Sequence, residues 1–234
     1  MTDSIATLSQ ENDISLIKLD DGKANAFSYD MLSQVNELLA KVPRDSGALV
    51  ITGRDGLFSG GFDLKTLATG DMEKITTMVQ LGYRLLLELY SFDRPIIAAV
   101  SGHSIALGLF VTCSADYRIA IDGQYVCQAN EVRNNMDIPV QIMEILKARV
   151  NKNYFYPAVY HSDAYSVQDS IAVGFIDEVV PEAQFMERVL EKAKELATLP
   201  HPFYANTKKS AQKDIVQKIT DAIEKYEKLA GLKN

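Results

Sequence analysis

The chain has 234 residues, 47% of them hydrophobic, and a formal net charge of −7 at pH 7. This length suits one large domain, or one domain with a helical appendage, and the apolar content is ample for a sizeable core. The negative charge argues against a broad nucleic-acid surface, although helix N-termini and a few local lysines can still hold an anionic ligand.

The first half of the chain predicts strands that alternate with helices. Ser28 is placed to cap a helix whose apolar stripe runs to Leu39. Strands are expected over residues 14–19, 48–52, 95–100 and 117–121, and further helices over about 72–91 and over 106–114. This alternation predicts right-handed β–α–β units in a mainly parallel sheet, which is an α/β fold.

The pattern changes after Glu131. Helical periodicity dominates over residues 139–150, 164–173, 182–199 and about 208–230, with one strand-like insert at 173–180. No repeat or Pro/Gly/Ser-rich linker divides the chain. We therefore expect an α/β core over residues 1–190, followed by a C-terminal helical region over 191–234 that makes oligomer contacts.

The sequence predicts neither a metal site nor a secretory signal. Cys113 and Cys127 lie in apolar surroundings without CxxC spacing, and the three histidines show no HxxxH spacing. The N-terminus has neither a basic region nor an apolar core, and no apolar run reaches membrane-spanning length. We expect a cytoplasmic protein with buried, reduced thiols, no metal and no membrane contact.

Two glycine-bearing, mostly apolar segments, 56–65 and 102–108, carry the strongest functional signal. Each follows an apolar strand, so each can aim backbone N–H groups into open space. Two such groups that converge on one oxygen make an oxyanion hole. Glu131 follows them in the chain. An oxyanion hole with one carboxylate nearby indicates chemistry at the carbon next to a carbonyl.

Short motifs lie along nearly the whole chain, at residues 23–28, 56–65, 102–108, 114–120, 130–132 and 172–180, and their order is characteristic of one family. Together they resemble the crotonase family, also called the enoyl-CoA hydratase/isomerase family. The resemblance implies a crotonase-like spiral of β–β–α units, assembled as a homotrimer or a dimer of trimers. It also implies an acyl-CoA thioester as substrate and no cofactor, since coenzyme A is part of the substrate.

The resemblance implies roles for individual residues of the acyl site. The N–H groups that hold the thioester oxygen fall at Phe62 and Leu107, and the catalytic carboxylate falls at Glu131. The preceding Asn130 makes an Asn-Glu pair that is especially similar to delta-3, delta-2-enoyl-CoA isomerases. Hydratases of the family have a second glutamate where this chain has Phe110. Because water addition needs two acid–base groups and double-bond migration needs one, the sequence favours an isomerase.

The resemblance also implies where coenzyme A binds. Backbone contacts are expected around Lys23, Ala24 and Ala26, and around Gly60, Gly61, Asp63 and Leu64. Phe62, Leu107 and Phe110 fill the acyl pocket with bulk, either as core packing or as determinants of specificity. We expect His103 to be a packed, hydrogen-bonded residue, Asp63 a helix or turn cap, and Asp116 and Arg118 structural.

Two alternatives remain open from the sequence. One is a hydratase or thioester hydrolase that uses an acid from the downstream segment, such as Asp137 or Glu144. The other is a catalytically weak acyl-CoA-binding or scaffold paralogue, which keeps the fold while Leu107 and Phe110 spoil the site.

Overall fold

The structure, a computed structural model, describes residues 4–232. Its larger sheet has six strands in the order β1-β2-β3-β5-β7-β10. Only the β1–β2 pair of this sheet is antiparallel. The strands are β1 (Ala6–Glu11), β2 (Ile14–Leu19), β3 (Ala48–Thr52), β5 (Ile96–Val100), β7 (Tyr117–Ile121) and β10 (Glu178–Val180).

A smaller sheet has four strands in the order β4-β6-β8-β9. They are β4 (Gly56–Ser59), β6 (Gly102–Ile105), β8 (Val126–Gln128) and the antiparallel β9 (Tyr165–Ser166). The neighbours β3, β5 and β7 of the larger sheet are each followed in the chain by β4, β6 and β8, which are neighbours in the smaller one. The chain therefore winds as the expected spiral of β–β–α units.

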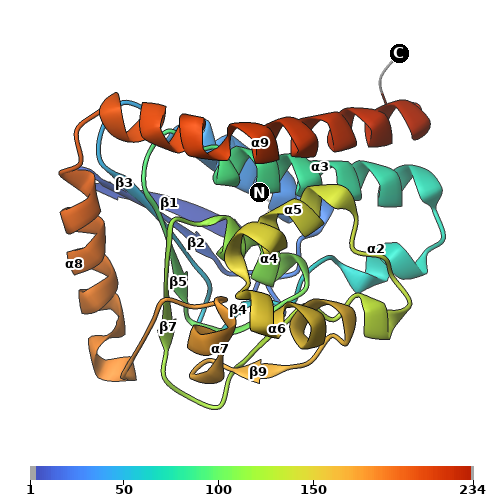
Figure 1. Cartoon of the computed structure of the whole chain (residues 1–234). Helices are drawn as coiled ribbons and strands as arrows, with labels where there is room; N and C mark the ends of the chain where they lie inside the picture. Colours follow the sequence, from blue (N-terminus) through green and yellow to red (C-terminus); the bar gives the residue numbers. More distant parts are fainter. Residues whose placement is uncertain (1–3, 233–234) are drawn as a thin grey trace.

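Helices follow the strand pairs of the spiral, and the two C-terminal helices lie on its outside (Figure 1). Ser28 caps the first helix as predicted, since its side chain accepts a hydrogen bond from the N–H of Met31. The α-helices are α1 (Tyr29–Leu39), α2 (Leu64–Ala68), α3 (Met72–Tyr90), α4 (Leu107–Ser114), α5 (Val140–Arg149), α6 (Lys152–Phe155), α7 (Asp169–Val173), α8 (Phe185–Ala197) and α9 (Phe203–Leu229). Single 3₁₀ turns cover Val132–Asn134 and Glu182–Gln184, and a π-helical turn covers Tyr156–Tyr160.

The central strands of the larger sheet are buried on both faces. Every residue of β3 and β5 is buried. One face packs against α8 through Phe185, Val189 and Ala193, and the other faces the main core. Burial on both sides explains why these strands are uninterrupted apolar runs. Cys113 and Cys127 are both buried and free, which confirms that prediction.

Helix α9 lies along α3 and α5 (Figure 1). Near its start, the ammonium group of Lys208 is buried against the carboxylate of Asp116, with 2.9 Å between Nζ and Oδ2. This helix confirms the predicted helical end of the chain, whereas its part in oligomer contacts stays a prediction. The prediction of a continuous helix over 164–173 was wrong: β9 occupies Tyr165–Ser166, and α7 begins at Asp169. Within residues 4–232, no helix has both the length and the apolarity to cross a bilayer.

Candidate active site

The two glycine-bearing segments lie in direct contact. Their strands β4 and β6 are parallel neighbours. A methyl group on Gly61 would lie 2.7 Å from the Cβ atom of Ala106 and 3.3 Å from the nitrogen of Leu107. Glycine at position 61, with φ of 94°, therefore permits an approach that a side chain would prevent.

Each segment offers one unused backbone donor next to this contact. The N–H of Leu107 stands in the first turn of α4, where no intrahelical acceptor exists. The N–H of Phe62 follows Gly61. Among residues 4–232, neither N–H has a hydrogen-bond acceptor. Two free donors on touching segments are the elements from which an oxyanion hole is built.

Ala106 turns the chain from β6 into α4 with an unusual backbone conformation. Its φ is 51° and its ψ is −125°, which is favourable for glycine and unfavourable for a residue with a Cβ atom. Such a residue costs about 1–3 kcal/mol and persists where surrounding structure holds it. The strained residue directly precedes Leu107, whose N–H is one of the two free donors. Strained backbone conformations of this kind cluster at functional sites.

A cavity of about 300 Å³ opens beside the two segments. Six of the residues predicted for the acyl and coenzyme A sites line it: Gly60, Phe62, Leu64, Phe110, Asn130 and Glu131. The remaining lining residues are Leu67, Val79, Tyr83, Ala106, Asn134, Met136, Asp137, Pro139 and Ile142. A mostly apolar cavity with a few polar groups is the usual form of a small-molecule site.

Glu131 places a carboxyl group in the wall of this cavity. The residue is 7% exposed, and among the described residues its Oε2 has no hydrogen-bond partner. Burial raises the pKa of Glu131 from its ordinary 4.5 to about 7. Its backbone is fixed, because its carbonyl oxygen accepts from the N–H of Asn134 and of Met136, both at 2.9 Å. A fixed carboxyl group with a pKa near neutrality is suited to take up and return a proton.

Asn130 and Tyr83 add polar groups beside Glu131. Within residues 4–232, the buried Oδ1 of Asn130 also lacks a hydrogen-bond partner. Burial raises the pKa of Tyr83 to about 12, and the negative charge of Glu131 adds to the effect. The sequence does not mark Tyr83 as a site residue, because the apolar pattern of α3 does not reveal which half-buried residue faces a cavity.

The two downstream acids proposed as a second acid–base group differ in position. Asp137 lines the cavity and is exposed. Glu144 does not line it. Its carboxylate binds Lys147 at 2.8 Å and Lys218 at 3.2 Å, and these contacts hold the pKa of Glu144 below its usual value. Of the pair, Asp137 alone is placed to reach a ligand in this cavity.

Several residues have the structural roles that the sequence predicted. Asp63 caps α2 by accepting from the N–H groups of Lys65 and Thr66. His103 accepts a hydrogen bond from the N–H of Val126 (3.1 Å) through Nδ1. The guanidinium group of Arg118 makes a bidentate ion pair with the carboxylate of Asp177, with 2.8 Å between Nε and Oδ2 and 2.6 Å between Nη2 and Oδ1.

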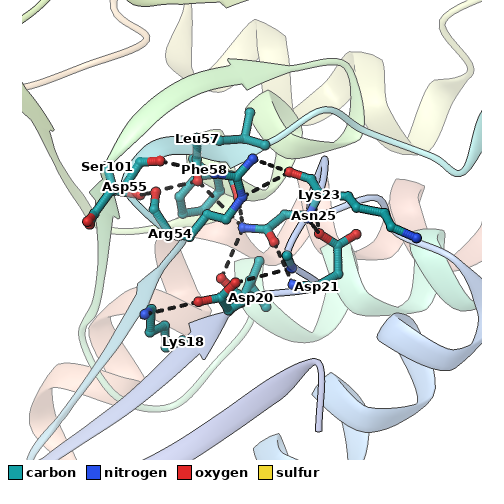
Figure 2. A network of polar contacts seen from close by, with 12 residues as sticks. Lys18, Asp20, Asp21, Lys23, Asn25, Arg54, Asp55, Leu57, Phe58 and Ser101 are labelled. Carbon is teal, nitrogen blue, oxygen red and sulfur yellow. Dashed lines mark hydrogen bonds and ion pairs between the residues drawn. The ribbon is translucent and has the colours of Figure 1, made fainter. Parts of the chain in front are cut away.

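The loop before α1 runs beside the first glycine segment. Lys23 and Ala24 are exposed and Ala26 is half-buried. The carbonyl oxygen of Ala24 accepts from the N–H of Gly60 at 3.0 Å, and that of Lys23 accepts from the guanidinium group of Arg54. Figure 2 shows how this loop is held by Asp21 and Asn25. The cavity lining does not include Lys23, Ala24 or Ala26, so their contact with coenzyme A stays a prediction.

The sequence model described as enoyl-CoA hydratase/isomerase matches residues 9–230. The chain therefore belongs to the enoyl-CoA hydratase/isomerase family, as its motifs indicate. Mitochondrial enoyl-CoA delta isomerase 1 of Homo sapiens is 24% identical over 191 residues, which cover 80% of this chain and 63% of that enzyme. The chain thus spans less than two thirds of the length of this curated relative.

Solved structures confirm the crotonase-like spiral. Enoyl-CoA hydratase EchA3 from Mycobacterium ulcerans Agy99 matches with a TM-score of 0.91 and 35% identity, over 96% of this chain and 98% of that one. A Mycobacterium tuberculosis protein has been described both as a probable enoyl-CoA hydratase and as an enoyl-CoA isomerase. Its two structures give TM-scores of 0.92 and 0.90 at 34% identity, over at least 97% of each chain.

Proposed function

We propose that this protein is an enoyl-CoA isomerase that moves a double bond from the 3,4 to the 2,3 position of an acyl-CoA thioester. The observation that carries the proposal is the carboxyl group of Glu131, which is buried in the cavity wall with Oε2 unpaired and a pKa near 7. The family of the chain and the name of its human relative support the same substrate class.

In the proposed reaction, the Glu131 carboxylate removes a proton from C2 of the 3-enoyl thioester. The electrons of that C–H bond form a dienolate, whose negative charge falls on the thioester oxygen. The N–H groups of Phe62 and Leu107 stabilise that oxygen. Glu131 then returns the proton to C4, so one carboxyl group completes the cycle. Loss of one such N–H donor typically costs about 3–4 kcal/mol in the barrier.

The side chain of Phe110 supports an isomerase over a hydratase. It lines the cavity and is only 1% exposed, and the family resemblance of the sequence implies that it replaces the second glutamate of hydratases. A phenyl ring can neither activate water nor donate a proton. A single proton carrier suffices for double-bond migration, whereas hydration needs one group for water and another for the C2 proton.

We also propose that coenzyme A binds along the loop of Lys23, Ala24 and Ala26 and beside Gly60. Lys23 and Ala24 of this loop are exposed, and the loop is joined to the first glycine segment by the hydrogen bond from the N–H of Gly60 to the carbonyl oxygen of Ala24. A homotrimer or a dimer of trimers, with contacts through residues 191–234, completes the proposal for the assembly.

Paired assays test the proposed activity. The purified protein is given a 3-enoyl-CoA and, separately, a 2-enoyl-CoA, while the absorbance of the conjugated thioester and the masses of the products are followed. We expect the 3-enoyl substrate to gain conjugation without a change in mass. Addition of water to the 2-enoyl substrate would identify a hydratase instead, and silence with both substrates would favour a binding paralogue.

The second candidate function is a hydratase in which Asp137 supplies the missing acid–base group. Its place in the lining of the cavity, together with Glu131, supports this alternative. Comparison of the wild type with Asp137→Asn separates the two proposals. An isomerase that relies on Glu131 keeps most of its turnover in this variant, whereas a hydratase that relies on Asp137 loses the addition of water.

A further inference from the structure

Ser59, the last residue of β4, is fully buried where the two glycine segments meet. Its hydroxyl donates a hydrogen bond to the carbonyl oxygen of Asn25 at 2.8 Å and accepts one from the N–H of Gly61 at 3.1 Å. The hydroxyl thus acts as donor and as acceptor, and it joins the loop before α1 to Gly61, the residue that precedes the Phe62 donor.

These contacts fix the direction of the Phe62 N–H. The carbonyl oxygen of Gly61 accepts from the N–H of Phe27 at 2.8 Å. That carbonyl and the N–H of Phe62 belong to one peptide unit, in which they point in opposite directions. Since Ser59 holds the nitrogen side of Gly61 and Phe27 holds its oxygen, the Phe62 N–H is directed away from the loop that contains Phe27.

Ser59 also lies against the segment that carries the second donor. A methyl group on Gly108 would lie 2.6 Å from the carbonyl oxygen of Ser59 and 2.8 Å from its Cβ atom. Gly108 directly follows Leu107. One buried serine thus touches the immediate neighbour of each donor, Gly61 on one side and Gly108 on the other.

The acceptor of the Ser59 hydroxyl is itself held in place (Figure 2). Asn25 is buried with φ of 45°, and its side-chain amide donates to the carbonyl oxygens of Leu19 at 2.9 Å and Phe58 at 3.2 Å. The carboxylate of Asp21 accepts from the N–H of Asn25 at 2.8 Å. Because the Asn25 carbonyl belongs to this network, the Ser59 hydroxyl is attached to a rigid support.

We infer that Ser59 is a positioning residue, whose hydroxyl sets the direction of the Phe62 donor and its separation from the Leu107 donor. The inference rests on the proposed function, because it assigns these two donors to one thioester oxygen. Ser59 does not line the cavity and acts through the peptide backbone. Its hydroxyl should therefore affect polarisation of the thioester more than binding of the acyl-CoA.

Infrared difference spectroscopy of a bound, saturated acyl-CoA labelled with carbon-13 at its carbonyl tests this inference without turnover. Hydrogen bonds from an oxyanion hole lower the stretching frequency of that carbonyl. We expect the wild type to show this lowering and Ser59→Ala to lose at least half of it. We also expect kcat to fall about tenfold to a hundredfold, with KM changed less than about threefold.

Ser104→Ala is a matched control. Ser104 pairs with Ser59 across β4 and β6 and is equally buried, but its hydroxyl contacts Thr112 Oγ1, at 3.0 Å. Thr112 keeps its hydrogen bond to the carbonyl oxygen of Gly108 when Ser104 is truncated. We expect the carbonyl frequency and kcat of this variant to stay near the wild-type values.

The outcomes separate the inference from the function on which it rests. A wild-type spectrum without any lowering would contradict the oxyanion hole, and with it both proposals. Full wild-type lowering in folded Ser59→Ala would overturn the role of Ser59 and leave the proposed function intact. If Ser59→Ala does not fold, Ser59→Cys is used instead; its side chain is somewhat larger and is a weaker donor and acceptor, and the same loss of lowering is expected.

Discussion

Gly61 and Ala106 face each other at the contact between the two glycine segments, and a methyl group on Gly61 would come within 2.7 Å of the Ala106 Cβ atom. Both residues have positive φ, 94° at Gly61 and 51° at Ala106. Each precedes a residue whose N–H is free, Phe62 or Leu107. The spacing of the two donors therefore depends on how closely these two backbones approach.

Ala106→Gly is expected to stabilise the protein, because it removes a Cβ atom from a conformation that disfavours one. The expected gain is about 1 kcal/mol, or about 2–4 °C in Tm for a chain of this size. Differential scanning calorimetry measures it. Ala115→Gly, at the other end of α4 with φ of −75°, is the control and should destabilise by about 0.5–1 kcal/mol. A loss of stability in both variants would contradict strain at Ala106.

Gly61→Ala is expected to lower turnover on a 3-enoyl-CoA by about a hundredfold, since the added methyl group displaces the donors. In the Ala106→Gly background the nearest obstructing atom is absent, so part of the activity should return. Steady-state kinetics of the two single variants and the double variant give the coupling between the sites. An equal loss in both backgrounds would show that the contact does not set the geometry of the site.

The contribution of Glu131 to the stability of the folded protein should fall as the pH rises towards 7. Because the pKa of Glu131 is about 7 in the folded chain and 4.5 ordinarily, the folded state binds more protons than the unfolded state in this window. Glu131→Gln has no such proton to lose. The free energy of unfolding of the variant, relative to that of the wild type, should therefore increase by up to about 3 kcal/mol as the pH rises from about 4.5 to above about 7. Urea unfolding across this range measures the difference, and parallel curves would contradict a raised pKa.

Activity should depend on pH in the opposite sense. The Glu131 carboxyl group must be ionised to remove the C2 proton, so kcat/KM should rise with pH and reach half its maximum near about pH 7. Isomerisation rates at fixed, low substrate concentration across this range give the profile. A profile that is flat down to about pH 5 would mean that the base has an ordinary pKa.

The edge strand β1 (Ala6–Glu11) was not predicted, because most of its residues are exposed. The central strands β3 and β5 of the larger sheet were predictable because burial on both faces leaves an unbroken apolar run, as in Ile96–Val100. Those of the smaller sheet were not. Gly56–Ser59 and Gly102–Ile105 are short, begin with glycine and contain polar residues, so they have neither a period of two nor a continuous apolar character. Tertiary pairing between the turns of the spiral makes them strands, and local sequence does not express that pairing.

The site was predictable where a motif marks a residue and unpredictable where packing alone selects it. Phe62, Phe110 and Glu131 were expected together and do line one cavity. Tyr83 lines the same cavity from α3, yet its position in the helix resembles that of other half-buried residues. The distinction between Asp137 and Glu144 also required the fold, because lysines on α5 and α9 bind the second carboxylate.

The most direct test of the account compares wild type and Glu131→Gln with a 3-enoyl-CoA under conditions in which binding is measured separately, by calorimetry with a saturated acyl-CoA. A single proton carrier predicts that kcat falls by about a hundredfold to ten-thousandfold while the affinity for the saturated acyl-CoA changes little. Glutamine has nearly the size and shape of glutamic acid, so the cavity is preserved. Turnover that survives this substitution would contradict Glu131 as the group that moves the proton.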